Sequence, residues 1–123
     1  MHHAYSGGIA GSSEGVIDNC YSTGGTECSG HSDYGAGGIS GNRGTADNCY
    51  WNINAVQITN GKDRDDSEKK GVDNGNDSTA PKTTAQMKLV GFVNLLNENR
   101  GENAEWLLDA DNLNDGYPIL KVR

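Results

Sequence analysis

Residues 11–15 read Gly-Ser-Ser-Glu-Gly, which matches the G-x-S-x-G pattern around the nucleophilic serine of many hydrolases. That serine needs a strand-to-helix turn beneath it, and an acid and a histidine from later in the chain. His31 is the only histidine after this segment, and no helical pattern follows it directly. We therefore interpret residues 11–15 as a glycine–serine corner and predict no catalytic residue.

Two groups of acidic residues could supply oxygen ligands to Ca²⁺. Neither follows the ligand spacing of a D-x-[DN]-x-[DN]-G calcium loop; in the second group, Leu113 and Asn114 occupy positions that need a ligand and a glycine. We interpret the first group as a solvated loop and the second as turn residues, and predict no metal site, but calcium binding stays open for both. The first group is Asp63, Asp65, Asp66, Glu68, Asp73 and Asp77, and the second is Asp109, Asp111 and Asp115.

The thiols and imidazoles do not have the spacing of a zinc site. Cys20, Cys28 and Cys49 form no C-x-x-C pair, and the three histidines are His2, His3 and His31. An odd cysteine count argues against a complete disulfide framework. A free cysteine behaves as a small buried hydrophobe, so we favour core filling over a metal site or a bridge.

Three aromatic residues, Tyr21, Tyr50 and Trp51, are the candidates for a binding surface. If they line one outer face, they could hold a sugar ring or a protein partner. The alternative is that they pack beneath the charged segment or the C-terminal region.

An internal repeat organises the first half of the chain. Residues 7–24 and 37–51 share eight identities in order, with a period of 30 residues at the glycines and 29 at the cysteines. The matched residues are Gly7, Gly8, Ile9, Gly11, Asp18, Asn19, Cys20 and Tyr21 in the first copy, and Gly37, Gly38, Ile39, Gly41, Asp47, Asn48, Cys49 and Tyr50 in the second.

Each copy contains short β-prone segments bounded by Gly, Ser, Asn or Asp, the residues that form turns. The repeat therefore predicts a mainly β fold, in which residues 1–58 form short right-handed parallel β-solenoid (β-helix) coils and Cys20 stacks on Cys49. We expect the small and apolar residues to point inward, namely Ile9, Ile17, Cys20 and Cys28 in the first coil and Ile39, Ala46 and Cys49 in the second.

The second half predicts a charged loop over 59–82 and a C-terminal helix-plus-strand cap over 83–123. A capping box at Thr83 and Gln86 begins a helix at about 84–99, whose apolar stripe is Leu89, Phe92, Val93 and Leu96. Trp106 should contribute much of the burial, and a terminal strand at about 117–121 should lie at an edge because Pro118 cannot donate to a ladder. We expect one domain, cut from a longer protein.

Composition excludes some functions. The chain has 123 residues, a net charge of −7 and 33% hydrophobic residues. The acidic balance opposes nucleic-acid binding, which needs a basic face. No apolar run is long enough to span a bilayer, so we expect no membrane insertion.

Residues 7–11 with 15–24, and more loosely 37–51, resemble the GLUG motif, a repeat of large bacterial surface and secreted proteins that also occurs in N-terminal regions of immunoglobulin-A-cleaving peptidases. The tail is similar to the segment after the last repeat of such proteins, with its Thr-rich helix start, a Trp and a closing Gly-Tyr-Pro-x-Leu. The resemblance implies a β-solenoid at the bacterial cell surface or outside the cell, and implies no activity.

These observations predict a non-enzymatic repeat module that acts as an adhesive or structural scaffold, without cofactor. A carbohydrate-binding accessory region of a larger polysaccharide-degrading enzyme or peptidase is the alternative. A catalytic β-helix would need convergent carboxylates, whereas Asp18 and Asp47 fit a repeated corner. The expected partner is a host or matrix protein or a glycan, and the exposed N-terminal coil should self-associate.

Overall fold

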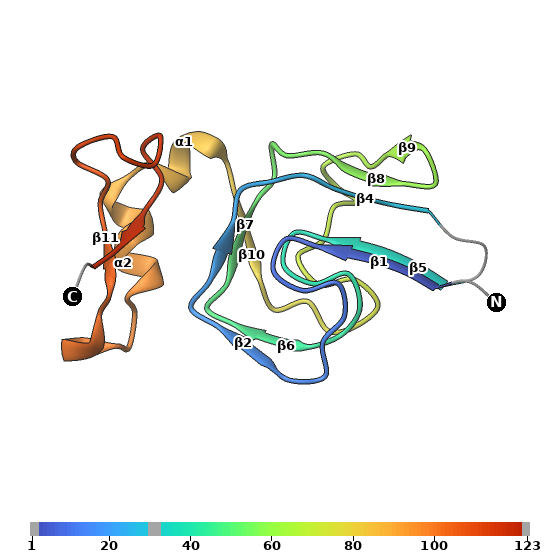
Figure 1. Cartoon of the computed structure of the whole chain (residues 1–123), viewed down its shortest axis with the longest axis horizontal. Coiled ribbons are helices and arrows are strands. Elements are labelled where there is room, and N and C mark those ends of the chain that lie inside the picture. Colours follow the sequence, from blue (N-terminus) through green and yellow to red (C-terminus); the bar gives the residue numbers. More distant parts are fainter. Residues whose placement is uncertain (1–2, 30–32, 122–123) are drawn as a thin grey trace.

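The computed structural model describes residues 3–29 and 33–121, which form short strands and two short helices (Figure 1). The first strands are β1 (His3–Gly7), β2 (Val16–Asp18), β3 (Tyr21–Ser22), β4 (Thr26–Cys28), β5 (Asp33–Gly37), β6 (Thr45–Asp47), β7 (Tyr50–Asn52), β8 (Gln57–Thr59) and β9 (Lys62–Asp63). They are followed by β10 (Ala80–Lys82), α1 (Thr84–Met87), α2 (Val90–Leu96), a 3-10 turn (Gly101–Asn103), β11 (Trp106–Leu107) and β12 (Ile119–Leu120).

Strands of the first repeat copy pair in parallel with strands of the second. β1 pairs with β5, β2 with β6, β3 with β7, and β4 with β8. Matched residues are direct partners, as Gly7 with Gly37 and Tyr21 with Tyr50 show. β10 adds a third parallel strand on the other side of β7. Corresponding segments of the two repeat copies therefore lie side by side in two layers.

The described strands nevertheless form five small, separate sheets of two or three strands, in mixed orientations. β9 runs antiparallel to β8, and β11 and β12 form an antiparallel pair. The prediction of right-handed parallel β-solenoid coils is therefore wrong; the fold is mainly β, with small sheets and two helices. One physical reason lies at Asn60 and Gly61, whose φ angles of 52° and 77° make the tight hairpin that Asn-Gly favours. The chain reverses there instead of advancing to another parallel strand.

The C-terminal region differs from the expected single helix over 84–99. Thr83 begins α1 with the expected capping box, but Leu89 is extended, with φ −98° and ψ 152°, and separates α1 from α2. Met87 and Phe92 are both buried, although five residues of continuous helix would turn them about 140° apart. The break at Leu89 lets both side chains face the core. The expected terminal strand is β12, which pairs with β11.

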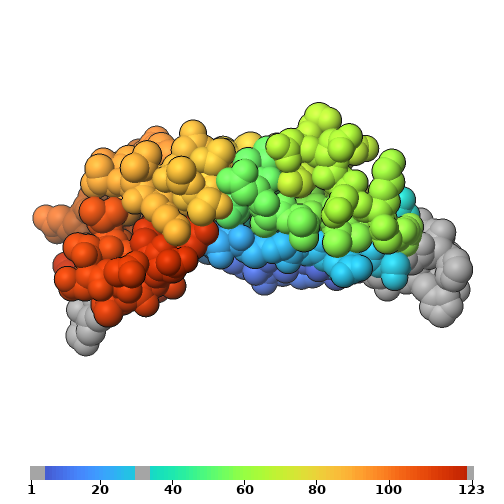
Figure 2. Space-filling view, turned by 90° about the horizontal axis from the view of Figure 1, so that it is seen from above, coloured from blue at the N-terminus to red at the C-terminus, as the bar shows by residue number. Residues whose placement is uncertain are grey.

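Two clusters make up the core. The first lies between the repeat copies and residue 72, and contains Ile39, Ala46, Cys49, Trp51 and Val72. The second joins the repeats to the C-terminal region, and contains Tyr50, Met87, Phe92 and Leu96, with Tyr21 and Trp106 packed against it. Figure 2 shows the C-terminal residues massed at one end of an elongated body.

The residues expected to point inward differ between the copies. In the second copy Ile39, Ala46 and Cys49 are buried, at 0%, 1% and 1% exposure. In the first copy Cys28 is buried, Ile17 and Cys20 are half-buried, and Ile9 is 46% exposed. The second copy lies between two neighbouring segments, as the bridges from Ser40 to Ala10 and to Val72 show. Among the described residues the first copy has such a neighbour on one side only, which leaves Ile9 exposed.

The charged segment 59–82 is not a structureless loop. It contains β9 and part of the hairpin, a bridge between Val72 and Ser40, and β10. Val72 is 1% exposed, so this segment supplies a core side chain despite its charge.

Candidate functional site

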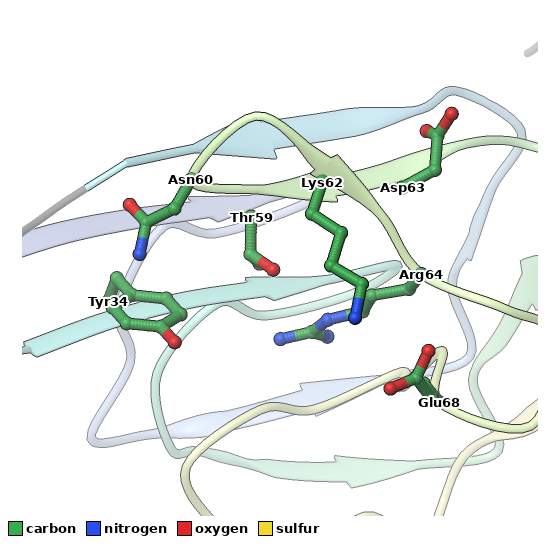
Figure 3. Close-up of a pocket in the computed structure, with 7 residues that line it drawn as sticks. All are labelled: Tyr34, Thr59, Asn60, Lys62, Asp63, Arg64 and Glu68. Carbon is green, nitrogen blue, oxygen red and sulfur yellow. The ribbon is translucent and has the colours of Figure 1, made fainter.

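A polar hollow beside the β8–β9 hairpin is the candidate binding site (Figure 3). Its volume is about 440 Å³, and it lies between β5 and residues 59–68. The residues that line it are Tyr34, Thr59, Asn60, Lys62, Asp63, Arg64 and Glu68. In Figure 3 the Lys62, Arg64 and Glu68 side chains lie together opposite Tyr34, while the Asp63 carboxylate points away from them.

Arg64 anchors the hollow to the core. Its guanidinium donates hydrogen bonds to the Ala36 carbonyl oxygen at 2.8 Å and to Gln57 Oε1 at 3.3 Å. It also forms an ion pair of 2.7 Å with Asp73 Oδ2, in which the two side chains are 14% and 9% exposed. Asp73 Oδ2 accepts a further hydrogen bond from the Ala36 amide at 3.1 Å. These bonds occupy the guanidinium, so Arg64 holds the walls of the hollow in place.

The other lining groups give the hollow a balanced charge. Lys62, Asp63 and Glu68 are exposed, and the Tyr34 residue is 38% exposed. Cations and anions are equal in number along the lining. Among the described residues that line the hollow, there is no Ser, Cys or His that a neighbouring base could activate. Such a lining suits an uncharged polar ligand that hydrogen-bonds to the walls and contacts the face of the Tyr34 ring.

The three aromatic candidates do not form an exposed face. Trp51 is 3% exposed, and its Nε1 donates a hydrogen bond of 2.9 Å to Thr79 Oγ1. Tyr50 is 8% exposed, and its ring stands at 81° to the Phe92 ring with centroids 5.3 Å apart. Tyr21 is half-buried, and its hydroxyl donates to the Pro118 carbonyl oxygen at 2.6 Å. These side chains hold the layers and the C-terminal region together.

Serine residues at 11–15 form a corner. Ser13 Oγ accepts a hydrogen bond of 3.2 Å from the Gly15 amide, and Ser12 Oγ accepts one of 3.1 Å from Asn42 Nδ2. A strand, β2, follows the segment in place of the helix that a nucleophile elbow requires.

Four of the nine acidic candidates accept hydrogen bonds from backbone amides, namely Glu68, Asp73, Asp77 and Asp109. Asp109 accepts hydrogen bonds from the amides of Leu113, Asn114 and Gly116 at 2.7–2.9 Å. Burial raises the pKa of the Asp109 carboxyl, but these three donors outweigh it and hold the pKa below its usual value. Asp77 accepts from the Gly71 amide at 2.8 Å. Within residues 3–29 and 33–121, no group of three or more His, Cys, Asp or Glu side chains could hold a metal ion.

A second polar hollow, of about 430 Å³, lies where the two repeat corners meet the end of α2. Its lining includes three carboxylates, Asp18, Asp47 and Glu98. All three are exposed to solvent, whereas catalytic carboxylate pairs need environments that differ between the acid and the base. The arrangement does not provide that difference.

All three cysteines are free thiols. Burial raises the pKa of the Cys28 thiol. The neighbouring Cys49 side chain lowers the pKa of Cys20 to about 7, and the neighbouring Cys20 side chain together with burial raises the pKa of Cys49. His2 and His31 lie outside the described residues, and His3 is described only as part of β1.

Sequence reasoning missed the role of the repeated asparagines. Asn19 and Asn48 both have φ 52°, a left-handed conformation that asparagine tolerates well. Their Nδ2 atoms donate hydrogen bonds of 2.8 Å to the carbonyl oxygens of Leu96 and Leu95. Those carbonyls lie at the C-terminal end of α2, where carbonyl oxygens lack N–H donors from a following helical turn. The repeated Asp-Asn-Cys-Tyr pointed to these positions, but not to their partners.

Comparison with protein-family models, with curated proteins and with solved structures found no match to this chain. Among the described residues, no helix is both long enough and apolar enough to cross a membrane.

Proposed function

We propose that the chain is a non-enzymatic repeat module that serves as an adhesive or structural scaffold. The observation that carries this proposal is the use of the repeat's asparagine and aromatic side chains in holding the molecule together. Tyr50 and Trp51 are buried, and Asn19 and Asn48 bond to α2. A binding or catalytic module would instead direct such groups into a site.

The proposed location is the surface or the exterior of a bacterial cell, and the proposed partner is a host or matrix protein or a glycan. The support is the resemblance of residues 7–24 to the GLUG motif. Self-association belongs to the same proposal, because the outer edges of β1 to β4 have no partner strand among the described residues. The first repeat copy also exposes two apolar side chains, Ile9 at 46% and Val16 at 68%.

Labelling of intact source cells with an antibody against the folded chain tests the location. We expect labelling before lysis, and loss of the signal after mild protease treatment of whole cells. Labelling that appears only after lysis would contradict the proposal. In parallel, beads coated with the folded chain should adhere to wells coated with a matrix protein or mucin, and beads coated with the heat-unfolded chain should not.

Carbohydrate binding is the second candidate, because Tyr34 is exposed beside the balanced polar lining of the β8–β9 hollow. A glycan array of the parent chain tests this function. Binding should weaken about tenfold in Tyr34→Ala, which corresponds to about 1.4 kcal/mol. Leu113→Ala, at an exposed position away from the hollow, should bind as the parent does. Equal binding by all three proteins would show that the hollow is not the glycan-binding site.

A further inference from the structure

Cys20 and Cys49 occupy the same corner of the two repeat copies. Each lies between two strands, β2 and β3 for Cys20, and β6 and β7 for Cys49. Backbone hydrogen bonds of 3.0 Å flank the pair, one from the Asn19 amide to the Asp47 carbonyl and one from the Tyr50 amide to the Cys20 carbonyl. The two cysteines are therefore held side by side in neighbouring layers.

This spacing allows a covalent bond. Neighbouring strands lie about 4.8 Å apart, and a disulfide needs Cα atoms about 4.4–6.8 Å apart. The Cys20 thiol donates to the Asp18 carbonyl oxygen at 3.1 Å, and the Cys49 thiol donates to the Ile17 carbonyl oxygen of the neighbouring layer at 3.4 Å. Closing the bond needs side-chain rotation, while the layers and their flanking hydrogen bonds can stay in place.

The two thiols differ in access and in reactivity. Cys20 is half-buried on the outer layer, whereas Cys49 is 1% exposed behind it. The neighbouring Cys49 thiol lowers the pKa of Cys20, whereas the pKa of Cys49 is raised, so Cys20 is the more readily ionised of the two thiols. A small oxidant would therefore meet the more nucleophilic thiol first. Cys28 has neither feature, because it is buried in another sheet, with its pKa raised.

We propose that Cys20 and Cys49 form a peroxide-sensitive dithiol that closes to a disulfide between the two repeat copies. The Cys20 thiolate attacks one oxygen of the peroxide, the O–O bond breaks, and hydroxide leaves, which gives a sulfenic acid at Cys20. The sulfur of Cys49 then attacks the Cys20 sulfur, the S–O bond breaks, and water leaves as the S–S bond forms. Overall, two thiols and one hydrogen peroxide give one disulfide and two waters. This inference is independent of the proposed function.

Mass spectrometry after peroxide treatment tests the proposal. The folded chain is treated with an equimolar amount of hydrogen peroxide, and the remaining thiols are alkylated with N-ethylmaleimide. We expect the chain to lose two hydrogen atoms, to take up one alkyl group, at Cys28, and to yield a peptide that joins Cys20 to Cys49. Treatment with dithiothreitol should restore three alkylation sites.

Single substitutions separate the roles of the thiols. Cys28→Ser should close as fast as the parent chain. Cys49→Ser should stop at the sulfenic acid of Cys20, which dimedone traps, and Cys20→Ser should react at least tenfold more slowly. Because variants at the buried pair can lose their fold, Cys28→Ser alone also decides the question: two free thiols after peroxide treatment, or bridges only between chains, would overturn the proposal. A bridge to Cys28 in the parent chain would overturn it as well.

Discussion

Trp106 Nε1 donates a hydrogen bond of 3.1 Å to the carbonyl oxygen of Asn19, which lies 87 residues earlier in the chain. The indole ring also packs at 5.2 Å from the Tyr21 ring, measured between centroids. One residue of the C-terminal region thus contacts two residues of the first repeat copy, Asn19 and Tyr21. These contacts make the tail part of the repeat core, and they lead to the following predictions.

Trp106→Ala should lower the free energy of unfolding by about 3 kcal/mol, at the lower end for a large aromatic residue because Trp106 is half-buried. The substitution removes the ring contact with Tyr21 and leaves the Asn19 carbonyl without this donor. Urea unfolding followed by circular dichroism measures the change. Leu113→Ala, at a residue that is 76% exposed, should change the value by less than about 0.5 kcal/mol. Equal midpoints for both variants would show that Trp106 does not support the core.

Asn48→Ala should be more destabilising than Asn48→Gly. Both lose the 2.8 Å hydrogen bonds that the side chain makes with the Leu95 carbonyl and the Tyr50 hydroxyl, at about 1 kcal/mol each. Alanine also has to adopt φ 52°, which glycine does without strain. We expect losses of roughly 3 and 2 kcal/mol in denaturant unfolding. A glycine variant less stable than the alanine variant would contradict this explanation.

Gly38→Ala and Gly91→Ala should have opposite effects. A Cβ at Gly38 would lie 2.4 Å from the Cβ of Trp51, so that the buried indole would have to move. A Cβ at Gly91 meets nothing within 4 Å, and Gly91 lies inside α2, where alanine is favoured by about 1 kcal/mol. Thermal melts should therefore show Gly38→Ala below the parent chain and Gly91→Ala above it. A Gly38→Ala chain as stable as the parent would mean that Trp51 is not packed there.

Asp109 should contribute stability that depends on pH. The fold lowers the pKa of its carboxyl, so the charged form is favoured in the folded state. Its contribution is therefore complete above the usual pKa of an aspartate, and is lost as pH falls through the lowered value. The stability difference between the parent chain and Asp109→Asn should be constant near neutral pH and shrink in acid. Asp111→Asn, at an exposed position, serves as the control. A stability difference that grows as pH falls would contradict this prediction.

The repeat predicts which strands pair, because matched residues of the two copies are direct partners, as Gly7 with Gly37 and Tyr21 with Tyr50 show. It did not give the architecture. The Asn60-Gly61 hairpin reverses the chain after the second copy, and the extended backbone of Leu89 divides the helix. Both depend on local turn chemistry and on what each short element can bury, which periodicity does not report.

The candidate site was less predictable than the fold. The polar hollow beside the β8–β9 hairpin is formed by β5 and residues 59–68, and the ion pair of Arg64 with Asp73 holds its walls in place. Six of the seven lining residues fall within 59–68 but show no motif, and nothing in the sequence joins them to Tyr34 or Asp73. Tyr21, Tyr50 and Trp51 stood out by type, but their burial depends on contacts with Thr79, Phe92 and Pro118 that no spacing rule predicts.

The central claim is that the repeats and the C-terminal region form one cooperative unit, and the two tryptophans measure it directly. Trp51 lies in the repeat core and Trp106 in the C-terminal region, so Trp106→Phe and Trp51→Phe leave one fluorescent probe in each part. In each variant, urea unfolding should give the same midpoint by tryptophan fluorescence and by far-ultraviolet circular dichroism, and one transition. If the fluorescence of Trp106 in Trp51→Phe changes at a lower urea concentration than the circular dichroism of the strands, the tail is a separate unit and the claim is wrong.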